Sequence, residues 1–157
     1  MNQLSVLPEA DLGKREPRSG NVQSKPSNKW ENYSLTLLDN GMVSSFGIYS
    51  KEKCKEWTAT PNFHVKPDEI RAIISGFEDD VTLRLHGISL QETMYTLTRM
   101  SWNHVMMVGR CSTAGNGCVI YLCRSCLLVA THLEGAQTSL CHSAVESLGD
   151  FLVQQGF

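Results

Sequence analysis

Cysteine and histidine are the side chains best suited to chemistry in this sequence, which has six cysteines and five histidines in 157 residues. Cys123 and Cys126 have the spacing of a zinc half-site or a redox dithiol. A redox pair normally lies where a strand enters a helix, which lowers the thiol pKa. Both flanks here have strand patterns instead, so the four residues are predicted to form a hairpin turn.

No second CxxC pair is present. We therefore interpret the cysteines as small buried hydrophobic residues and turn residues. The alternative is a zinc or thiol protein, whose ligands would be Cys111, Cys118, Cys123, Cys126 and His132.

The remaining histidines do not suggest catalysis. His64, His86 and His104 fall on different predicted elements, with no carboxylate or thiol at catalytic or metal-ligand spacing. The sequence also has no GxSxG, HExxH or P-loop pattern. We expect no enzyme, no catalytic residue, no cofactor and no metal.

The aromatic residues form a more informative set. Trp30 and Tyr33 are three residues apart on a predicted helix, so their rings share one face. Phe151 and Phe157 bracket Leu152 near the end of the last predicted helix. If the two helices pack side by side, these residues and Trp57 converge into an aromatic groove that suits a polyproline II ligand. The alternative is that they are ordinary core contacts.

Composition and charge exclude several classes of protein. With 41% hydrophobic and 19% charged residues, the chain is typical of one globular domain. No apolar run approaches the roughly 20 residues of a membrane span, and we see no secretory signal. The net charge of −2 and the absence of lysine after Lys66 argue against nucleic acid as a ligand. We expect a cytoplasmic protein with reduced thiols.

The first part of the chain divides into a tail and the start of a domain. Residues 1–28 are rich in proline and polar residues and lack aromatics, which predicts a disordered tail before a domain at 29–157. The domain should begin with a short amphipathic helix that stops at Asn40-Gly41. Strands follow at 43–49 and 55–59. Pro67 and two acidic residues then open a second helix, whose buried face is Ile70, Ile73, Ile74 and Phe77.

The rest of the chain has mainly strand patterns. Period-two or short apolar runs predict an antiparallel meander, with strands at 81–86, 93–99, 103–109, 117–123 and 126–133. A final helix is expected from 139 to 155, with an inward stripe of Cys141, Ala144, Val145, Leu148 and Leu152. The fold class is therefore α+β, with a central antiparallel sheet and terminal helices able to share one face.

Taken together, these segments resemble a profilin over about residues 29–157. The resemblance is carried by residues 30–33, 56–61, 63–70 and 141–157, and the closing helix is similar to that of plant and protist profilins. Residues 127–135 and 146–150 also resemble the divergent fourth vertebrate profilin. The resemblance implies a sheet with the terminal helices on one face and small helices on the other. It implies a polyproline site at Trp30, Tyr33, Trp57, Phe151, Leu152 and Phe157.

The resemblance also implies partners. A profilin is expected to be a cytoplasmic and cytoskeletal monomer that binds monomeric actin, proline-rich segments of formin-like factors, and phosphoinositides. The residues that match the actin face are Arg110, His142 and Glu146. Lysines usual in the family are missing here, which weakens charge-assisted contacts with actin and lipid. The alternative is a divergent profilin that has lost actin and acts through acidic lipid or other protein partners.

Overall fold

The computed structural model describes residues 41–157, so the predicted tail and the predicted first helix lie outside the described residues. Seven strands of the described part form one antiparallel sheet in the order β2-β1-β7-β6-β5-β4-β3. The strands are β1 (Ser45–Ser50), β2 (Glu56–Ala59), β3 (Ile88–Leu90), β4 (Thr93–Met100), β5 (Met106–Arg110), β6 (Gly117–Leu122) and β7 (Cys126–His132).

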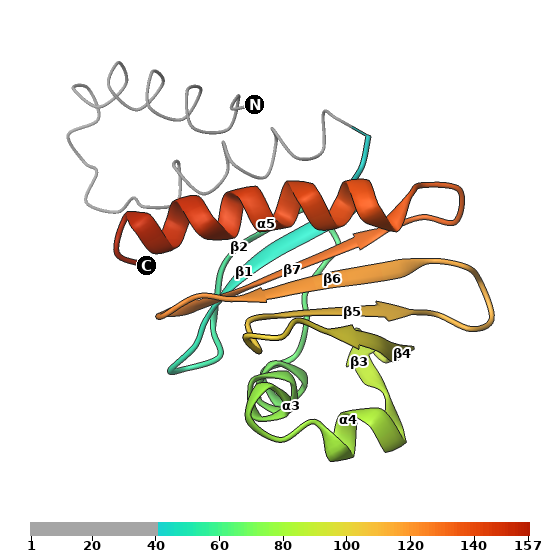
Figure 1. Ribbon diagram of the computed structural model, residues 1–157, viewed down its shortest axis with the longest axis horizontal. Helices are drawn as coiled ribbons and strands as arrows, with labels where there is room; N and C mark the ends of the chain where they lie inside the picture. Colours follow the sequence, from blue (N-terminus) through green and yellow to red (C-terminus); the bar gives the residue numbers. More distant parts are fainter. Residues whose placement is uncertain (1–40) are drawn as a thin grey trace.

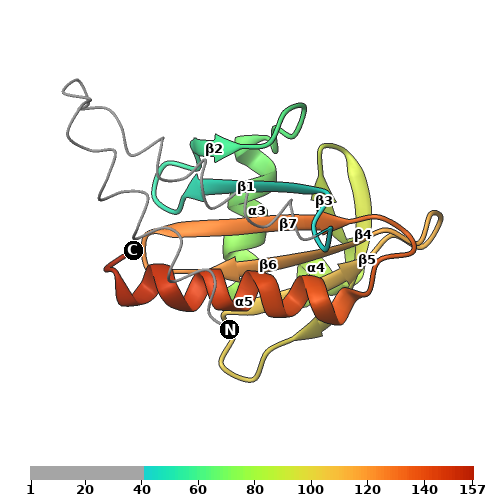
Figure 2. The same ribbon diagram turned by 90° about the horizontal axis from the view of Figure 1, so that it is seen from above.

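Helices cover both faces of this sheet (Figure 1). Helix α5 (Thr138–Gln154) lies on one face, packed on β6 and β7, and runs roughly along the strands (Figure 2). Helices α3 (Pro67–Glu78) and α4 (Val81–His86) lie on the other face. The α+β fold class is confirmed, and so is the placement of α5 opposite the small helices.

Strand β7 shows why the sheet holds two cores. All seven of its residues are buried, because both of its faces are covered. Leu127 and Val129 point into the cluster beneath α3, whereas Cys126, Leu128 and Ala130 point into the cluster beneath α5. Because successive side chains of a strand point to opposite faces of the sheet, each residue of β7 packs against one of the two helical layers.

Helix α3 forms as the sequence predicts. Pro67 occupies the first turn, where its missing N–H costs nothing. Ile70, Ile73 and Phe77 are buried, while Ile74 is partly exposed and packs at the edge of the same cluster. The 3.6-residue period was enough to identify this face.

Glu69 ties α3 to the turn between β3 and β4. Its carboxylate accepts hydrogen bonds from the Gln91 and Glu92 N–H groups at 2.9 Å each and from the Ser89 hydroxyl at 2.5 Å. It also accepts the Lys66 N–H at 3.1 Å, which satisfies a main-chain donor at the start of α3. These bonds explain how Gln91 and Glu92 hold positive φ values of 53° and 69° without glycine.

The predicted strand at 81–86 is wrong, because these residues form α4. Their apolar residues alternate as in a strand, yet only Leu83 is buried, while Val81 and Leu85 are 57% and 73% exposed. Local polar contacts favour the helix. The Asp79 carboxylate accepts the Val81 N–H at 3.1 Å, and Arg84 pairs with Asp80 at 2.7 Å, one turn apart.

The antiparallel meander is otherwise confirmed, with different boundaries. The strand β3 (Ile88–Leu90), which the sequence analysis missed, replaces the predicted strand at 81–86 as the first of five consecutive strands. The strand expected at 103–109 begins at Met106, because residues 101–105 form a turn. In that turn the Ser101 hydroxyl accepts the N–H groups of Val105 and Met106 at 3.1 and 3.0 Å.

Candidate functional site

Three of the aromatic residues predicted to bind proline-rich ligands lie near the C-terminal end of α5. Trp57 comes from β2, Phe151 from the last turns of α5, and Phe157 from the segment after it. The rings of Trp57 and Phe157 have centroids 6.4 Å apart and planes at 71°, an edge-to-face pair. All three side chains are half-buried. We call Trp57, Phe151 and Phe157 the aromatic cluster.

Phe157 is held in place by its main chain. Its N–H donates to the Leu152 carbonyl oxygen at 2.9 Å, which turns the chain back over the end of α5. The Phe157 carbonyl oxygen accepts two hydrogen bonds from Ser125, one from the N–H at 2.5 Å and one from the hydroxyl at 2.7 Å. Ser125 lies in the turn between β6 and β7, so this turn positions a ring of the aromatic cluster.

Leu152 lies on the inward face of α5, where the predicted stripe of the last helix places it. It is fully buried and packs with Val145 and Leu148 in the cluster between α5 and the sheet. It supports the aromatic cluster from beneath. Trp30 and Tyr33, the other two residues predicted for this groove, lie outside the described residues.

Of the residues predicted for the actin face, Arg110 and His142 lie near the N-terminal end of α5, and Glu146 lies halfway along it. Arg110 ends β5 and is exposed, and its guanidinium donates to the Thr138 hydroxyl at 3.0 Å. Thr138 begins α5 and contacts the buried His132 at Nε2, 2.9 Å away. His132 Nδ1 is 3.1 Å from the Leu133 carbonyl oxygen. Since a carbonyl only accepts, Nδ1 donates and Nε2 accepts, which fixes the direction of this chain of bonds.

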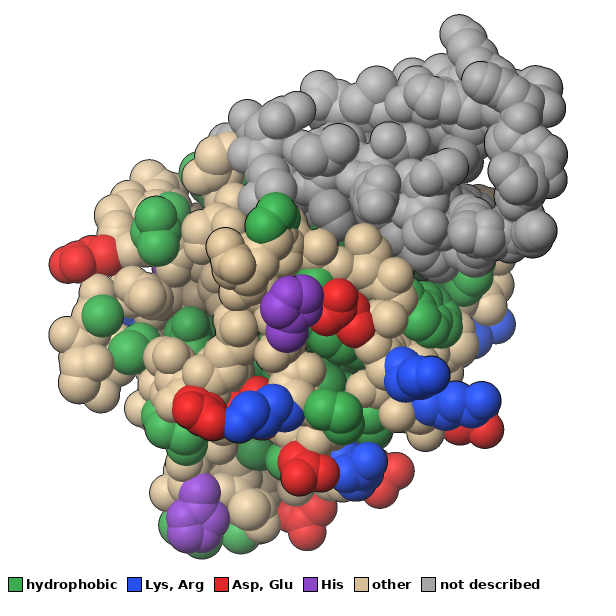
Figure 3. Space-filling view, turned by 180° about the vertical axis from the view of Figure 1, so that it is seen from behind, with side chains coloured by type: hydrophobic (Ala, Val, Ile, Leu, Met, Phe, Trp, Pro, Cys, Tyr) green, Lys and Arg blue, Asp and Glu red, His purple; other side chains and the backbone are tan. Residues whose placement is uncertain are grey.

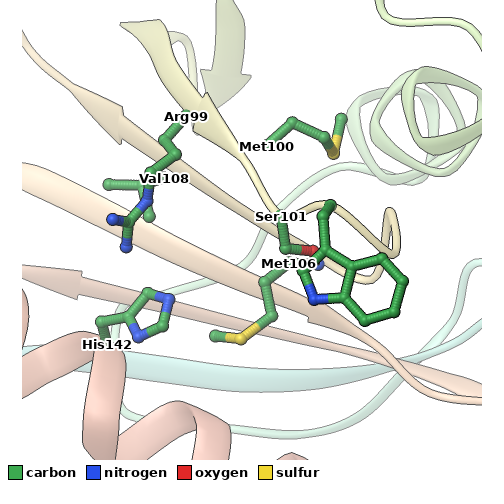
Figure 4. Close-up of a pocket in the computed structure, with 7 residues that line it drawn as sticks. Arg99, Met100, Ser101, Met106, Val108 and His142 are labelled. Atoms are coloured by element: carbon green, nitrogen blue, oxygen red, sulfur yellow. The ribbon is translucent and has the colours of Figure 1, made fainter.

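His142 and Glu146 lie one turn apart on α5, with Nδ1 and Oε1 separated by 3.8 Å. His142 also borders a surface hollow of about 290 Å³ between α5 and the β4–β5 hairpin. Figure 4 shows the Arg99 guanidinium and the His142 imidazole on the same side of this hollow, with Met106 nearby. We call the surface formed by Arg110, His142, Glu146 and this hollow the β5–α5 face.

Two residues of this hollow were missed by the sequence analysis. Arg99 lies on β4, and Trp102 lies in the turn that follows, where its side chain is 90% exposed. A tryptophan in a predicted turn is a signal that could have been used, because a side chain of this size is usually at least partly buried. The position of Arg99 beside His142 had no comparable signal, since it depends on the packing of α5 across the sheet.

The residues of the zinc alternative are not brought together. Within residues 41–157 no group of three or more His, Cys, Asp or Glu side chains could hold a metal ion. Cys118 lies in the core beneath α3, whereas Cys123 and Cys126 lie in the core beneath α5. All six cysteines are buried and none is in a disulfide, in agreement with the interpretation of them as small hydrophobic residues.

Surface charge is mixed on the face seen in Figure 3, where acidic and basic side chains lie next to one another. Among the described residues, Lys66 pairs with Glu92 and Arg71 with Asp68. The described residues on this face therefore form no extended basic area of the kind that attracts anionic lipid. Among the described residues, no helix is long and apolar enough to cross a membrane.

Comparisons with known proteins agree with this architecture. A family model described as Profilin matches residues 28–157. Profilin-4 of Bos taurus is 29% identical over 122 residues, covering 77% of this chain and 92% of the relative. Profilin of Saccharomyces cerevisiae is 26% identical over 124 residues, covering 79% and 95%. The crystal structure of Acanthamoeba castellanii profilin II superposes with a TM-score of 0.74 at 26% identity, covering 82% and 99%.

The seven-stranded antiparallel sheet, with α5 on one face and α3 and α4 on the other, is the profilin fold. Since the family model spans most of the chain, the protein belongs to the profilin family. The resemblance stated from the sequence is thus confirmed.

Proposed function

We propose that this profilin binds proline-rich segments at the aromatic cluster, together with Trp30 and Tyr33. The observation that carries this proposal is the edge-to-face pair of Trp57 and Phe157, with centroids 6.4 Å apart at the end of α5. Aromatic surfaces suit polyproline II because this helix is preformed and loses little conformational entropy on binding. Its carbonyl oxygens can also accept a hydrogen bond from the indole N–H.

The same proposal includes an actin monomer on the β5–α5 face. The Arg110 guanidinium supplies a positive charge and is oriented by its hydrogen bond to Thr138. His142 and Glu146 supply polar groups on α5. Solved structures of this fold include mouse profilin IIa with a double repeat from the FH1 domain of mDia1, and LokiProfilin2 with rabbit actin. At 20% and 17% identity these two support only the capacity of the fold to hold such partners.

Both partners can be held at once in this proposal. Helix α5 has 17 residues, and at about 1.5 Å per residue it is about 25 Å long. The aromatic cluster lies at its C-terminal end, whereas Arg110 and His142 lie near its N-terminal end and Glu146 lies halfway along, so neither ligand needs to displace the other. A protein that holds an actin monomer next to a proline-rich assembly factor raises the local concentration of actin there. We place this non-enzymatic activity in the cytoplasm and cytoskeleton.

The test uses the full chain in two assays. Retention on immobilised poly-L-proline, with elution by free poly-L-proline, measures the first activity. Polymerisation of pyrene-labelled actin, with and without a proline-rich formin segment, measures the second. We expect retention on the resin, sequestration of monomers at micromolar protein, and faster elongation once the formin segment is added.

Other results separate the alternatives. No effect on actin at tens of micromolar, with retention on poly-L-proline intact, would identify a divergent profilin that has lost actin. Sedimentation with vesicles containing phosphoinositide would then test acidic lipid as its partner. Loss of both activities in folded protein would refute the proposal as a whole.

A further inference from the structure

Cys123 and Cys126 flank the two-residue turn between β6 and β7. Leu122 pairs with Leu127 in the register of these strands, so the two cysteines are the next opposite pair. The Cys123 N–H donates to the Cys126 carbonyl oxygen at 2.8 Å. Opposite residues in an antiparallel pair have Cα atoms about 4.5–5.5 Å apart, within the range of about 4.4–6.8 Å that disulfides adopt. The expected Cα spacing of this pair therefore lies within the disulfide range, and closing the bond requires the two side chains to approach.

The two side chains also point to the same side of the sheet. Both belong to the core cluster beneath α5, and the Cys126 side chain lies next to the Cys123 thiol. The Cys123 sulfur lies 3.9 Å from the Gly149 carbonyl oxygen on α5. The contact with Cys126 and burial raise the pKa of the Cys123 thiol. Because the thiolate is the reactive form, the reduced pair needs a small oxidant that can enter a buried site.

We propose that Cys123 and Cys126 are a modification site that forms an intramolecular disulfide with a peroxide as oxidant. One thiolate attacks a peroxide oxygen; a sulfur–oxygen bond forms, the oxygen–oxygen bond breaks, and the released hydroxide takes up the thiol proton to become water. The second thiolate attacks the sulfenic sulfur and displaces hydroxide, which takes up the second proton. Two thiols and one hydrogen peroxide thus give one disulfide and two waters, with two electrons passing from sulfur to oxygen.

The turn between these cysteines is the one that holds the aromatic cluster. Ser125 donates its N–H and its hydroxyl to the Phe157 carbonyl oxygen at 2.5 and 2.7 Å. The ring of Phe157 in turn packs edge-to-face on Trp57. A change in the turn is therefore transmitted through two hydrogen bonds to one ring of the cluster.

Disulfide formation changes this turn in two ways. The sulfur–sulfur bond, about 2.05 Å long, is much shorter than a contact between two thiols, so the strand ends must move to close it. The Cys123 thiol also loses the hydrogen that faces the Gly149 carbonyl oxygen. We expect the Ser125 bonds to Phe157 to weaken and the affinity for proline-rich ligands to fall. This last link rests on the proposed function, whereas the disulfide itself does not.

Peptide mapping tests the disulfide directly. Folded full-length protein is treated with hydrogen peroxide, free thiols are alkylated, and trypsin is added. Trypsin cleaves after Arg124, so Cys123 falls in peptide 111–124 and Cys126 in peptide 125–157. We expect the two peptides to be joined with the loss of two hydrogens, with fragmentation placing the link at Cys123 and Cys126, and to separate on reduction. Separate peptides, or a link through another cysteine, would overturn the proposal.

Two variants provide the matched comparison. Cys126→Ala removes one partner, and Cys141→Ala removes a buried cysteine from the same tryptic peptide and the same core cluster. We expect the link to disappear in the first variant and to persist in the second. Thermal unfolding followed by circular dichroism checks that each variant is folded. A link that survives in folded Cys126→Ala would contradict the assignment.

The binding arm measures the affinity for a proline-rich peptide before and after oxidation. We expect a several-fold loss in the oxidised parent, full recovery with reductant, and no change in peroxide-treated Cys126→Ala. Equal affinity of the reduced and disulfide forms would refute the link to the aromatic cluster. Failure of the reduced parent to bind any proline-rich peptide would instead refute the proposed function, and the peptide map would still decide the disulfide.

Discussion

The two ends of α5 are built on different physical principles. At the C-terminal end, Trp57 and Phe157 form a ring pair, and the Phe157 main chain is held by Leu152 and Ser125. At the N-terminal end, the β5–α5 face consists of a few polar side chains around a hollow. One surface is apolar and fixed by backbone hydrogen bonds, whereas the other depends on side chains near water.

This difference has a consequence for partner binding. Contacts between aromatic rings and a polyproline helix depend on shape and buried area, so they are insensitive to the missing lysines. An exposed ion pair is worth only about 0.2–1 kcal/mol, so a face that relies on such pairs loses affinity with each cation removed. We therefore expect proline binding to be robust and actin binding to be the more easily lost activity.

The largest effect should come from removing one ring of the aromatic cluster. Trp57→Ala takes away the edge-to-face partner of Phe157, so we expect retention on poly-L-proline to be abolished. Trp102→Ala is the matched control, because it makes the same substitution at a tryptophan on the hollow of the β5–α5 face. It should be retained like the parent. Equal retention of the two variants on poly-L-proline would contradict the assignment of proline binding to the aromatic cluster.

The next largest effect should weaken binding at both regions, because both lie on α5. A methyl group at Gly149 would overlap the Tyr121 ring, which packs against the helix and donates to Asp150 at 2.6 Å. Overpacking of this kind costs about 1–3 kcal/mol. We expect Gly149→Ala to lower the free energy of unfolding by about this amount and to weaken the binding of both ligands.

Urea unfolding and the two binding assays check this variant. Ser147→Ala, an exposed change on the same helix, serves as the control and should match the parent in all three measurements. A Gly149→Ala variant with parental stability would show that α5 can shift on the sheet without cost.

A smaller and more selective effect is expected at the β5–α5 face. Arg110→Ala removes the exposed cation that Thr138 orients, so we expect a several-fold loss of affinity for monomeric actin. Retention on poly-L-proline should not change, because the cluster lies at the other end of α5. Titration of pyrene-actin with the variant measures the first quantity. A parallel loss of both activities would mean that the two ends of α5 are coupled.

The smallest functional effect should come from Glu69, which lies on neither surface. Burial raises the pKa of its carboxyl, but hydrogen bonds from Ser89, Glu92, Lys66 and Gln91 outweigh burial, so its pKa is lowered on folding. A lowered pKa contributes stability that is complete above the unfolded value, about 4.3 for glutamate. This contribution is lost as the pH falls through the folded pKa.

We expect Glu69→Gln to be less stable than the parent at neutral pH and to lose less stability on acidification. Urea unfolding measured from neutral pH to about pH 3 gives both slopes, which should differ below the unfolded glutamate pKa. Glu78→Gln changes an exposed carboxylate at the end of the same helix and should follow the parent. Ligand binding at neutral pH should be unaffected in both variants.

Much of the fold was predictable because its signals are local. The period of Ile70, Ile73 and Phe77 identified α3, and the stripe around Val145 and Leu148 identified α5, since each periodic face became buried. The α4 segment was wrongly predicted as a strand, because its apolar residues alternate although two of the three remain exposed. Its helix comes from the contacts of Asp79 and Asp80 with the first turn and from Leu83 packing beside Gly76, which apolar alternation does not record.

The candidate site was predictable only in part. Residue type and resemblance named Trp57, Phe151 and Phe157, because aromatic rings near a helix end suggest a groove without any knowledge of their neighbours. The burial of Leu152 was predicted by its place on the inward stripe of the last helix, whereas its place in the polyproline site came only from the resemblance. The Arg99 and Trp102 hollow and the Ser125 hydrogen bonds were missed, because their partners are distant along the chain.

The sequence by itself determined the α+β class, most of the strands, the helices α3 and α5, and membership of the profilin family. These follow from periodicities and motifs that lie within short stretches of chain. Only the tertiary structure decided that Ser125 holds Phe157, that Cys123 and Cys126 face the same core as α5, and that Arg110 reaches Thr138. Each of these contacts joins elements whose distance in space is set by sheet register and helix packing, which no local pattern encodes.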